Sequence, residues 1–216
     1  MSRFSKIVYL MFIAMVMAGC SSIPEQPTSV EWQSHQIQLE KLTHYQAAGK
    51  LAYISPEQRQ SLNFIWKHSP QQSQLRLTTF LGQTALNLTI DAQGAKVVTY
   101  DDEVFTHQDA SVLVKQLTGL SIPVQHMPQW LLGNPEQADS YTLNDDTNTL
   151  ASLSKVVGHQ FWQLDYTSYR NIELTSSTSS NDNTNSPLKL PLPAKLTFKQ
   201  DQTRINIVIS KWTLTK

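Results

Sequence analysis

The sequence predicts a mainly β protein, built from one curled antiparallel sheet of about ten or eleven strands with a few helices packed against it. Two observations support this prediction. Apolar and polar residues alternate with a period of two over consecutive short segments, which short polar turns separate. Helical spacing occurs only before the first of these segments and near the middle of the chain. A sheet with one apolar face must cover that face, so it either curls on itself or leaves an apolar cavity.

The strands are predicted wherever the alternation persists. The clearest case is the last one, in which Ile205, Ile207 and Ile209 recur at every second position. The "DAQG" stretch at 91–94 is a predicted turn. In chain order, the predicted strands cover residues 50–55, 61–66, 74–79, 84–91, 97–100, 103–106, 141–143, 149–157, 160–167, 194–200 and 204–211.

Three helices are predicted. The first covers residues 30–45, where apolar residues recur at helical spacing and Gly49 lies beyond the end. The second covers 108–117 and ends before Gly119, and a short third one lies within 124–132, limited by Pro123 and Pro128. Two short helices are a thin cover for so many strands, so an apolar cavity is the main indication of function.

The beginning of the chain has the features of a lipoprotein signal. Arg3 and Lys6 precede an uncharged apolar run at 7–17. This run is too short to span a bilayer as a helix, which needs about 20 residues, but it fits the apolar region of a signal peptide. The stretch Met17-Ala18-Gly19-Cys20 resembles the bacterial lipobox, and Cys20 is the only cysteine. The alternative is an ordinary signal peptide with an incidental cysteine.

The lipobox resemblance implies a covalently anchored protein. Cys20 is expected to carry an S-diacylglycerol and an N-palmitoyl group after residues 1–19 are removed. Two acyl chains already suffice for stable anchoring. Ser21, in place of the aspartate that retains lipoproteins in the inner membrane, favours the outer membrane. Residues 20–29 contain two prolines and are interpreted as a lipidated tether, and residues 30–216 as a single domain.

Composition argues against several classes of function. After residue 19 the chain has 15 basic and 17 acidic residues, so nucleic acid is not an expected partner. No H-E-x-x-H, G-x-S-x-G or P-loop motif occurs, so no catalytic residue, metal or other cofactor is expected. The "YDDE" stretch at 100–103 could be a metal or acid–base site, but a solvated hairpin turn is the favoured interpretation.

Two further segments stand out. "TSSTSSNDNTNS" at 175–186 is polar and of low complexity, which predicts a disordered loop inserted between two strands. In "TTFLGQT" at 78–84, Phe80 and Leu81 occupy the position where a turn is expected. Either both side chains are buried by a shifted register, or they form an apolar tip that enters a bilayer or contacts a partner.

Several longer stretches resemble the LolB family of outer-membrane lipoprotein receptors. They are "YQAAGKLAYIS" (45–55), "FIWKH" (64–68), "LRLTTFLGQTALNL" (75–88), "LTGLSIPVQHMPQWLLGNP" (117–135) and "RINIVISKW" (204–212). The chain departs from this family at Phe80, where a proline is common before the leucine, and in the insertion at 175–186.

The resemblance implies an unclosed antiparallel β-barrel whose helices cover an apolar cavity. It also implies a monomer, lipid-anchored at the periplasmic face of the outer membrane, that accepts acylated lipoproteins from the carrier LolA and passes them into outer-membrane lipid. Phe80 and Leu81 would form the membrane-insertion tip. The alternatives are a lipid-binding or structural envelope lipoprotein without transfer activity, or a hydrolase with dispersed residues. The residues expected to line the acyl-chain cavity are Phe64, Trp66, Leu77, Leu88, Trp130 and Ile207.

Overall fold

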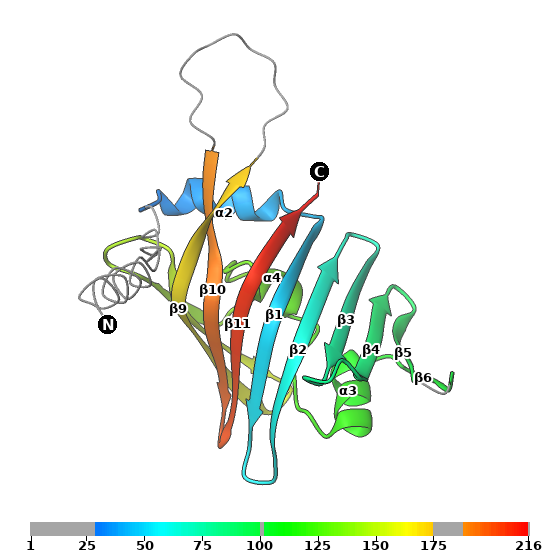
Figure 1. Ribbon diagram of the computed structural model, residues 1–216. Helices are drawn as coiled ribbons and strands as arrows, with labels where there is room; N and C mark the ends of the chain where they lie inside the picture. Colours follow the sequence, from blue (N-terminus) through cyan, green and yellow to red (C-terminus); the bar gives the residue numbers. More distant parts are fainter. Residues whose placement is uncertain (1–28, 100–101, 175–187, 216) are drawn as a thin grey trace, which may run out of the picture.

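A computed structural model describes residues 29–99, 102–174 and 188–215 of the chain, and these residues form one eleven-stranded antiparallel sheet (Figure 1). The strand order is β6-β5-β4-β3-β2-β1-β11-β10-β9-β8-β7, so β6 and β7 are the edges and do not pair with each other. The predicted mainly β, unclosed architecture is confirmed. The strands are β1 (Tyr45–Ile54), β2 (Arg59–His68), β3 (Gln72–Thr78), β4 (Thr84–Asp91), β5 (Gly94–Val98), β6 (Val104–His107), β7 (Ser140–Leu143), β8 (Leu150–Val157), β9 (Gln160–Leu174), β10 (Leu188–Gln200) and β11 (Thr203–Leu214).

The sheet consists of two meanders joined at its centre. Strands β1 to β6 follow one another through hairpins, and so do β7 to β11. The join is the antiparallel pair β1–β11, which runs from Tyr45↔Leu214 to Ile54↔Arg204. The predicted period-two alternation holds: in β2, for example, Leu62, Phe64 and Trp66 are buried and the residues between them are not. All inward-facing side chains therefore gather on one concave face.

The first helix is shorter than predicted. Helix α2 covers Trp32–Glu40, and the Glu31 carboxylate caps it by accepting hydrogen bonds from two backbone N–H groups of the first turn. The predicted extension of this helix to Tyr45 is wrong, because β1 begins at that residue. Residues 45–54 also fit a period of two, and β2 and β11 on either side satisfy their backbone groups.

Helix α2 lies across one end of the sheet (Figure 1) and buries His35 and Leu39. Both His35 ring nitrogens are buried without a hydrogen-bond partner in the described part of the chain. Burial lowers the pKa of His35 to about 4. His35 is therefore neutral at physiological pH and packs as a core residue.

The segment between the two sheet edges, residues 108–139, crosses the concave face and is called the roof below. It contains α3 (Ala110–Thr118) and α4 (Met127–Trp130), both of which lie behind the sheet in Figure 1. The Asp109 carboxylate caps α3, and Gly119, at φ +73°, ends it in the left-handed conformation. The roof fills the concave side with buried apolar residues: Leu113, Val114, Leu120, Ile122, Val124, Met127, Trp130, Leu131 and Leu132.

Several predictions concern residues outside the described ranges. These are the signal peptide at 1–19, all but the last residue of the tether at 20–29, the insertion at 175–186 and the first half of "YDDE". The ends of β9 and β10 flank the insertion, as expected for a segment between two strands. Among the described helices, none has the length and apolar character needed to cross a membrane.

Gly49 is a specific requirement of the central join. The register between β1 and β11 shifts at Ala48/Gly49, and a Cβ atom at Gly49 would lie 1.9 Å from the backbone oxygen of Val208. We expect Gly49→Ala to lower the free energy of unfolding by about 2–3 kcal/mol, because backbone must move on both strands. Urea unfolding measures this change.

Gly82→Ala is the matched control. Gly82 also has a positive φ, +83°, but no atom lies within 4 Å of its Cβ position. Its cost is limited to the backbone conformation, about 1 kcal/mol. Equal losses for the two variants would show that the close approach at Gly49 is not limiting.

Candidate functional site

The six residues predicted to line an acyl-chain cavity all lie on the concave side of the molecule. Phe64 and Trp66 are on β2, Leu77 on β3, Leu88 on β4 and Ile207 on β11, while Trp130 comes from α4 in the roof. Phe64 is the register partner of Leu77, so these two side chains are neighbours. The fold thus brings residues from 64 to 207 into one apolar cluster.

This concave side is packed in the structure. Each of the six side chains is at most 2% exposed. Phe198 lies between two tryptophans, with ring centroids 6.3 Å from Trp130 and 6.5 Å from Trp162. The structure therefore represents a closed state in which the roof residues occupy the concave face. The assignment of the six residues to acyl-chain binding stays a prediction.

Side-chain hydrogen bonds from the sheet hold the roof backbone. Tyr45 Oη donates to the carbonyl oxygen of Pro128 and accepts from the Trp66 indole N–H at 3.2 Å. On the other meander, Tyr166 Oη donates to the carbonyl oxygen of Trp130 at 2.8 Å.

Two weaker contacts hold the N-terminal part of the roof. Gln58 Nε2 donates to the carbonyl oxygen of Gly119 at 3.1 Å, and the Ser121 N–H donates to Tyr53 Oη at 3.5 Å. These single hydrogen bonds fasten the roof to both meanders. At its C-terminal end, Asp139 adds a backbone hydrogen bond to Ser154, accepts from the Val156 N–H and forms an ion pair with Lys155, all on β8.

We call Tyr45 and Tyr166 the tyrosine latches, because their hydroxyl groups donate hydrogen bonds to the roof backbone. Both latches are neutral groups. Burial raises the pKa of both Tyr45 and Tyr166 well above the usual range, so both phenols keep their protons and act as donors. Between them, the Trp130 indole N–H is buried and has no hydrogen-bond partner among the described residues. Such an unpaired donor is costly to bury.

Two open grooves flank α3. One, of about 280 Å³, lies between α3 and the β8–β9 hairpin, where Val112, Ile122 and Trp162 provide apolar walls. The other, of about 370 Å³, lies between α3 and strands β4 to β6, with Leu86 and Phe105 in its walls. Both volumes are near the lower end of the range for a drug-sized ligand, about 300–1,000 Å³. Several acyl chains would need more space than either groove offers.

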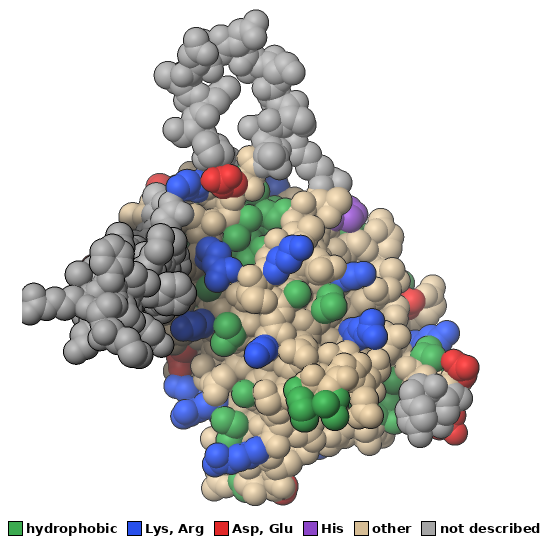
Figure 2. All heavy atoms as spheres, in the orientation of Figure 1, with side chains coloured by type: hydrophobic (Ala, Val, Ile, Leu, Met, Phe, Trp, Pro, Cys, Tyr) green, Lys and Arg blue, Asp and Glu red, His purple; other side chains and the backbone are tan. Residues whose placement is uncertain are grey.

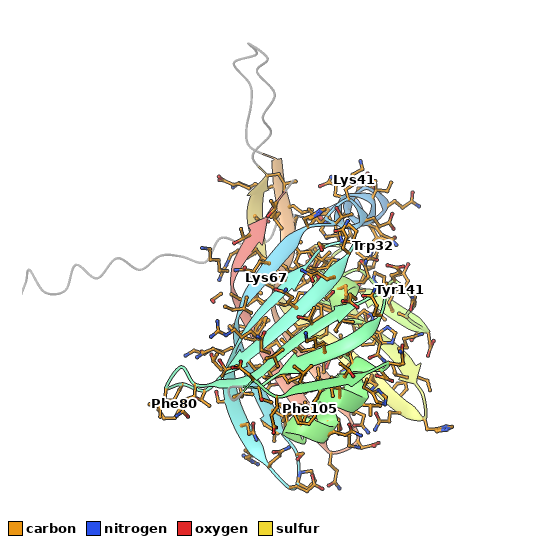
Figure 3. The ribbon with its side chains drawn as sticks, turned by 90° about the vertical axis from the view of Figure 1, so that its right-hand side faces the viewer. Trp32, Lys41, Lys67, Phe80, Phe105 and Tyr141 are labelled. Atoms are coloured by element: carbon orange, nitrogen blue, oxygen red, sulfur yellow. The ribbon has the colours of Figure 1, made fainter. Side chains whose placement is uncertain are left out.

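The predicted tip projects into solvent. Phe80 is 85% exposed and Leu81 is 71% exposed, and Figure 3 shows Phe80 extending away from the sheet. The turn closes through Thr79 N–H to the carbonyl oxygen of Gln83 at 2.9 Å and Gly82 N–H to that of Thr79 at 3.0 Å. The alternative in which a shifted register buries both side chains is wrong. Insertion of the tip into a membrane is not tested by its exposure.

The remaining candidate is the "YDDE" stretch. Its described half, Asp102 and Glu103, is exposed and belongs to a turn in which the Thr99 N–H donates to the carbonyl oxygen of Glu103. Within the described ranges no three histidine, cysteine or acidic residues are close enough to bind a metal ion.

Sequence reasoning did not find the tyrosine latches. The two latches, Tyr45 and Tyr166, occupy buried, inward-facing positions of β1 and β9, as does Tyr53 of β1. Their place in the alternation was a usable signal, since a phenol on an apolar face needs a hydrogen-bond acceptor. Which acceptor it finds depends on the roof.

The sequence matches one protein family over most of its length. The model of the family described as "Outer membrane lipoprotein LolB" matches residues 43–212. Three relatives named "Outer-membrane lipoprotein LolB" illustrate the range. That of Vibrio atlanticus (strain LGP32) is 68% identical over 100% of both chains. That of Vibrio vulnificus (strain YJ016) is 52% identical over 95% of this chain and 96% of the relative. That of Pectobacterium atrosepticum is 36% identical over 92% and 91%.

A solved structure supports the fold alone. A DUF1329 family protein from Desulfovibrio piger resembles this chain with a TM-score of 0.51 at 9% identity, covering 84% of this chain and 90% of the other.

Loss of one latch should loosen the roof. We expect Tyr166→Phe to destabilise the closed roof by about 1 kcal/mol, because the Trp130 carbonyl loses its buried donor. Amide hydrogen exchange in residues 119–132 should then be about fivefold faster, while exchange in β1 and β11 stays unchanged.

Tyr169→Phe is the control for this variant. Tyr169 is also a buried tyrosine of β9, but its hydroxyl donates to Leu150 of β8 at 2.7 Å and not to the roof. Equal acceleration of roof exchange in both variants would contradict the role of Tyr166 as a latch.

Proposed function

Because the chain belongs to the LolB family of outer-membrane lipoproteins, we propose that it accepts acylated lipoproteins from a periplasmic carrier of the LolA type and inserts them into the outer membrane. The observation that carries the proposal is the concave apolar face. It is large and continuous, and one connecting segment with few polar attachments covers it.

In this proposal acyl chains replace the roof. When α3 and α4 move away, the inward side chains of β2, β3, β4 and β11 become available to fatty tails. The residues proposed to contact them are the six of the concave cluster, and the free indole N–H of Trp130 would donate to an ester carbonyl of the lipid. The two grooves beside α3 leave space next to the roof, and opening is proposed to begin there.

The replacement explains how transfer proceeds without a nucleotide. Opening exposes apolar side chains of the roof and the sheet, which costs free energy, and each buried methylene of an incoming acyl chain offsets about 0.8 kcal/mol of this cost. When the acyl chains leave for the membrane, the roof closes and buries the same side chains again. Loading and release are therefore near balance, and an affinity difference of 1.4 kcal/mol between carrier, receptor and membrane directs the cargo by a factor of about ten.

The proposal includes an anchor and assigns no catalytic step. Cys20, with S-diacylglycerol and N-palmitoyl groups, would hold a monomeric domain at the periplasmic face of the outer membrane, with residues 20–29 as the tether. Tethering raises the local concentration of receptor over the acceptor bilayer.

The tip is proposed to act in release. Leu81→Glu should leave transfer from carrier to receptor intact but slow insertion of the lipoprotein into the bilayer, because a charged side chain does not enter hydrocarbon. Insertion is followed as lipoprotein that co-sediments with outer-membrane vesicles. Ile37→Glu is the control, since Ile37 is 51% exposed on α2, on a different element. An unchanged insertion rate for Leu81→Glu would rule out the tip mechanism.

Acyl chains bound on the concave side can be detected through the fluorescence of nearby tryptophans. A lipoprotein with brominated acyl chains, delivered on its carrier, should quench the fluorescence of Trp66 and Trp130. The quenched fraction should fall more in Trp66→Phe and Trp130→Phe than in Trp32→Phe, because Trp32 lies on α2, is only partly buried and packs against the cluster from its edge. Efficient removal of cargo from the carrier without quenching would place the chains elsewhere.

The same delivery experiment separates the alternative. A lipid-binding or structural envelope lipoprotein without transfer activity would leave the acylated cargo on its carrier. A receptor depletes the loaded carrier in proportion to the receptor added.

A further inference from the structure

The convex face of the sheet has an unusual charge distribution. Five adjacent strands, β3, β2, β1, β11 and β10, contain no aspartate or glutamate. The whole chain is formally neutral, so charge is segregated onto this part of the molecule. The basic residues of these five strands are Lys50, Arg59, Lys67, Arg76, Lys189, Lys195, Lys199, Arg204 and Lys211. Of these, Lys199 forms an ion pair with Asp165 on the neighbouring strand β9 at 2.5 Å.

The register places cations and apolar side chains side by side on this face. Val208 pairs with Lys50 on β1 and with Lys195 on β10, and Ile65 pairs with Arg76 on β3. Val208 is 44% exposed and Ile65 is 37% exposed. Figure 2 shows basic groups spread across the face, with acidic groups confined to its rim. We call this surface the cationic face.

The cationic face is continuous with the Phe80–Leu81 tip. The row of register partners Lys195, Val208, Lys50, Asn63 and Thr78 ends where the tip begins. Asn63 Nδ2 also donates to the carbonyl oxygen of Thr79 at 3.3 Å, which ties the tip to this row. In Figure 3 the tip projects to the same side as Lys67. A surface that meets the tip therefore meets these lysines as well.

We propose that the cationic face lies against the bilayer and binds the anionic phosphate headgroups of its lipids. This inference rests on the proposed function, in which the tip enters the membrane. Cations distributed at strand spacing over a broad face, without a pocket among them, fit an extended anionic surface. Lys50, Lys67 and Lys195 supply long stems with a terminal charge, and the apolar side chains between them fit the interfacial region.

This orientation leaves the roof free. Helices α3 and α4 lie on the opposite side of the sheet, as Figure 1 shows, so the two grooves beside α3 face away from the bilayer. The carrier can then reach the roof while the cationic face holds the receptor on the membrane.

Lysine footprinting tests the proposal on the complete acylated protein. The protein is reconstituted into vesicles of phosphatidylcholine alone or with phosphatidylglycerol added, and a water-soluble amine reagent labels exposed lysines, which mass spectrometry quantifies. Lys50, Lys67 and Lys195 are all exposed residues of the cationic face. We expect their labelling to be about fivefold slower in anionic vesicles, as about 1 kcal/mol per cation implies, and the protection to be lost in high salt.

Internal controls are present in the same molecule. Lys41 at the end of α2 and Lys115 on α3 are exposed but lie off the cationic face, so their labelling should not change. A triple variant, Lys50→Gln, Lys67→Gln and Lys195→Gln, should slow insertion of cargo into anionic vesicles only. The corresponding control pair is Lys41→Gln and Lys115→Gln.

The outcomes separate the inference from the proposed function. Equal labelling of the three lysines in both vesicle types overturns the inference, as does protection that needs the carrier, which would indicate a protein partner. If Leu81→Glu still slows insertion in that case, the tip mechanism stands without the headgroup contact. If the three lysines are protected in anionic vesicles while Leu81→Glu inserts lipoproteins at the normal rate, the headgroup contact of the cationic face is supported and the tip mechanism is contradicted.

Discussion

The apolar concave face of an unclosed sheet is the constraint on which the rest of the structure depends. Strands β6 and β7 are the two edges and are not paired with each other, so strand pairing does not seal the concave side. The segment that connects these two edges crosses the gap and brings its buried apolar residues into it. Before Asp139 its backbone lies outside the sheet ladder, and phenol and amide side chains of the sheet supply hydrogen-bond partners to it. The cover of the core is therefore held by apolar packing and a small number of side-chain hydrogen bonds.

The two faces of the same strands carry different chemistry. Because side chains alternate across a strand, each residue of β2 faces either the roof or the outside. Phe64 and Trp66 face the concave side, while Ile65 and Lys67 face the convex side. One set of strands thus separates the proposed binding face for fatty tails from the proposed binding face for phosphate groups by the thickness of a single sheet.

Much of this architecture could be predicted from the sequence, because alternation is a local signal. The strands β2 to β8, β11 and both roof helices lie close to their predicted positions, whereas β9 continues to Leu174 and β10 begins at Leu188, beyond the predicted ranges 160–167 and 194–200. The boundary between α2 and β1 could not be placed, since residues near Tyr45 satisfy both periods and only pairing with β11 decides between them. The position of the tip was predicted, but its exposure depends on what packs beside it. The cationic face was missed because its residues are dispersed, one to three per strand, in a neutral chain. The latches were missed because their acceptors belong to the roof.

The central pair β1–β11 has a consequence for how the protein is made. Hairpins link the strands within each meander, but Tyr45 meets Leu214, near the other end of the chain. Neither half can complete the sheet alone, so the middle of the molecule forms after synthesis of the last strand. Until then β1 presents an open edge that can pair with foreign strands. A polypeptide of this topology therefore needs protection from aggregation until both halves of its sheet are present.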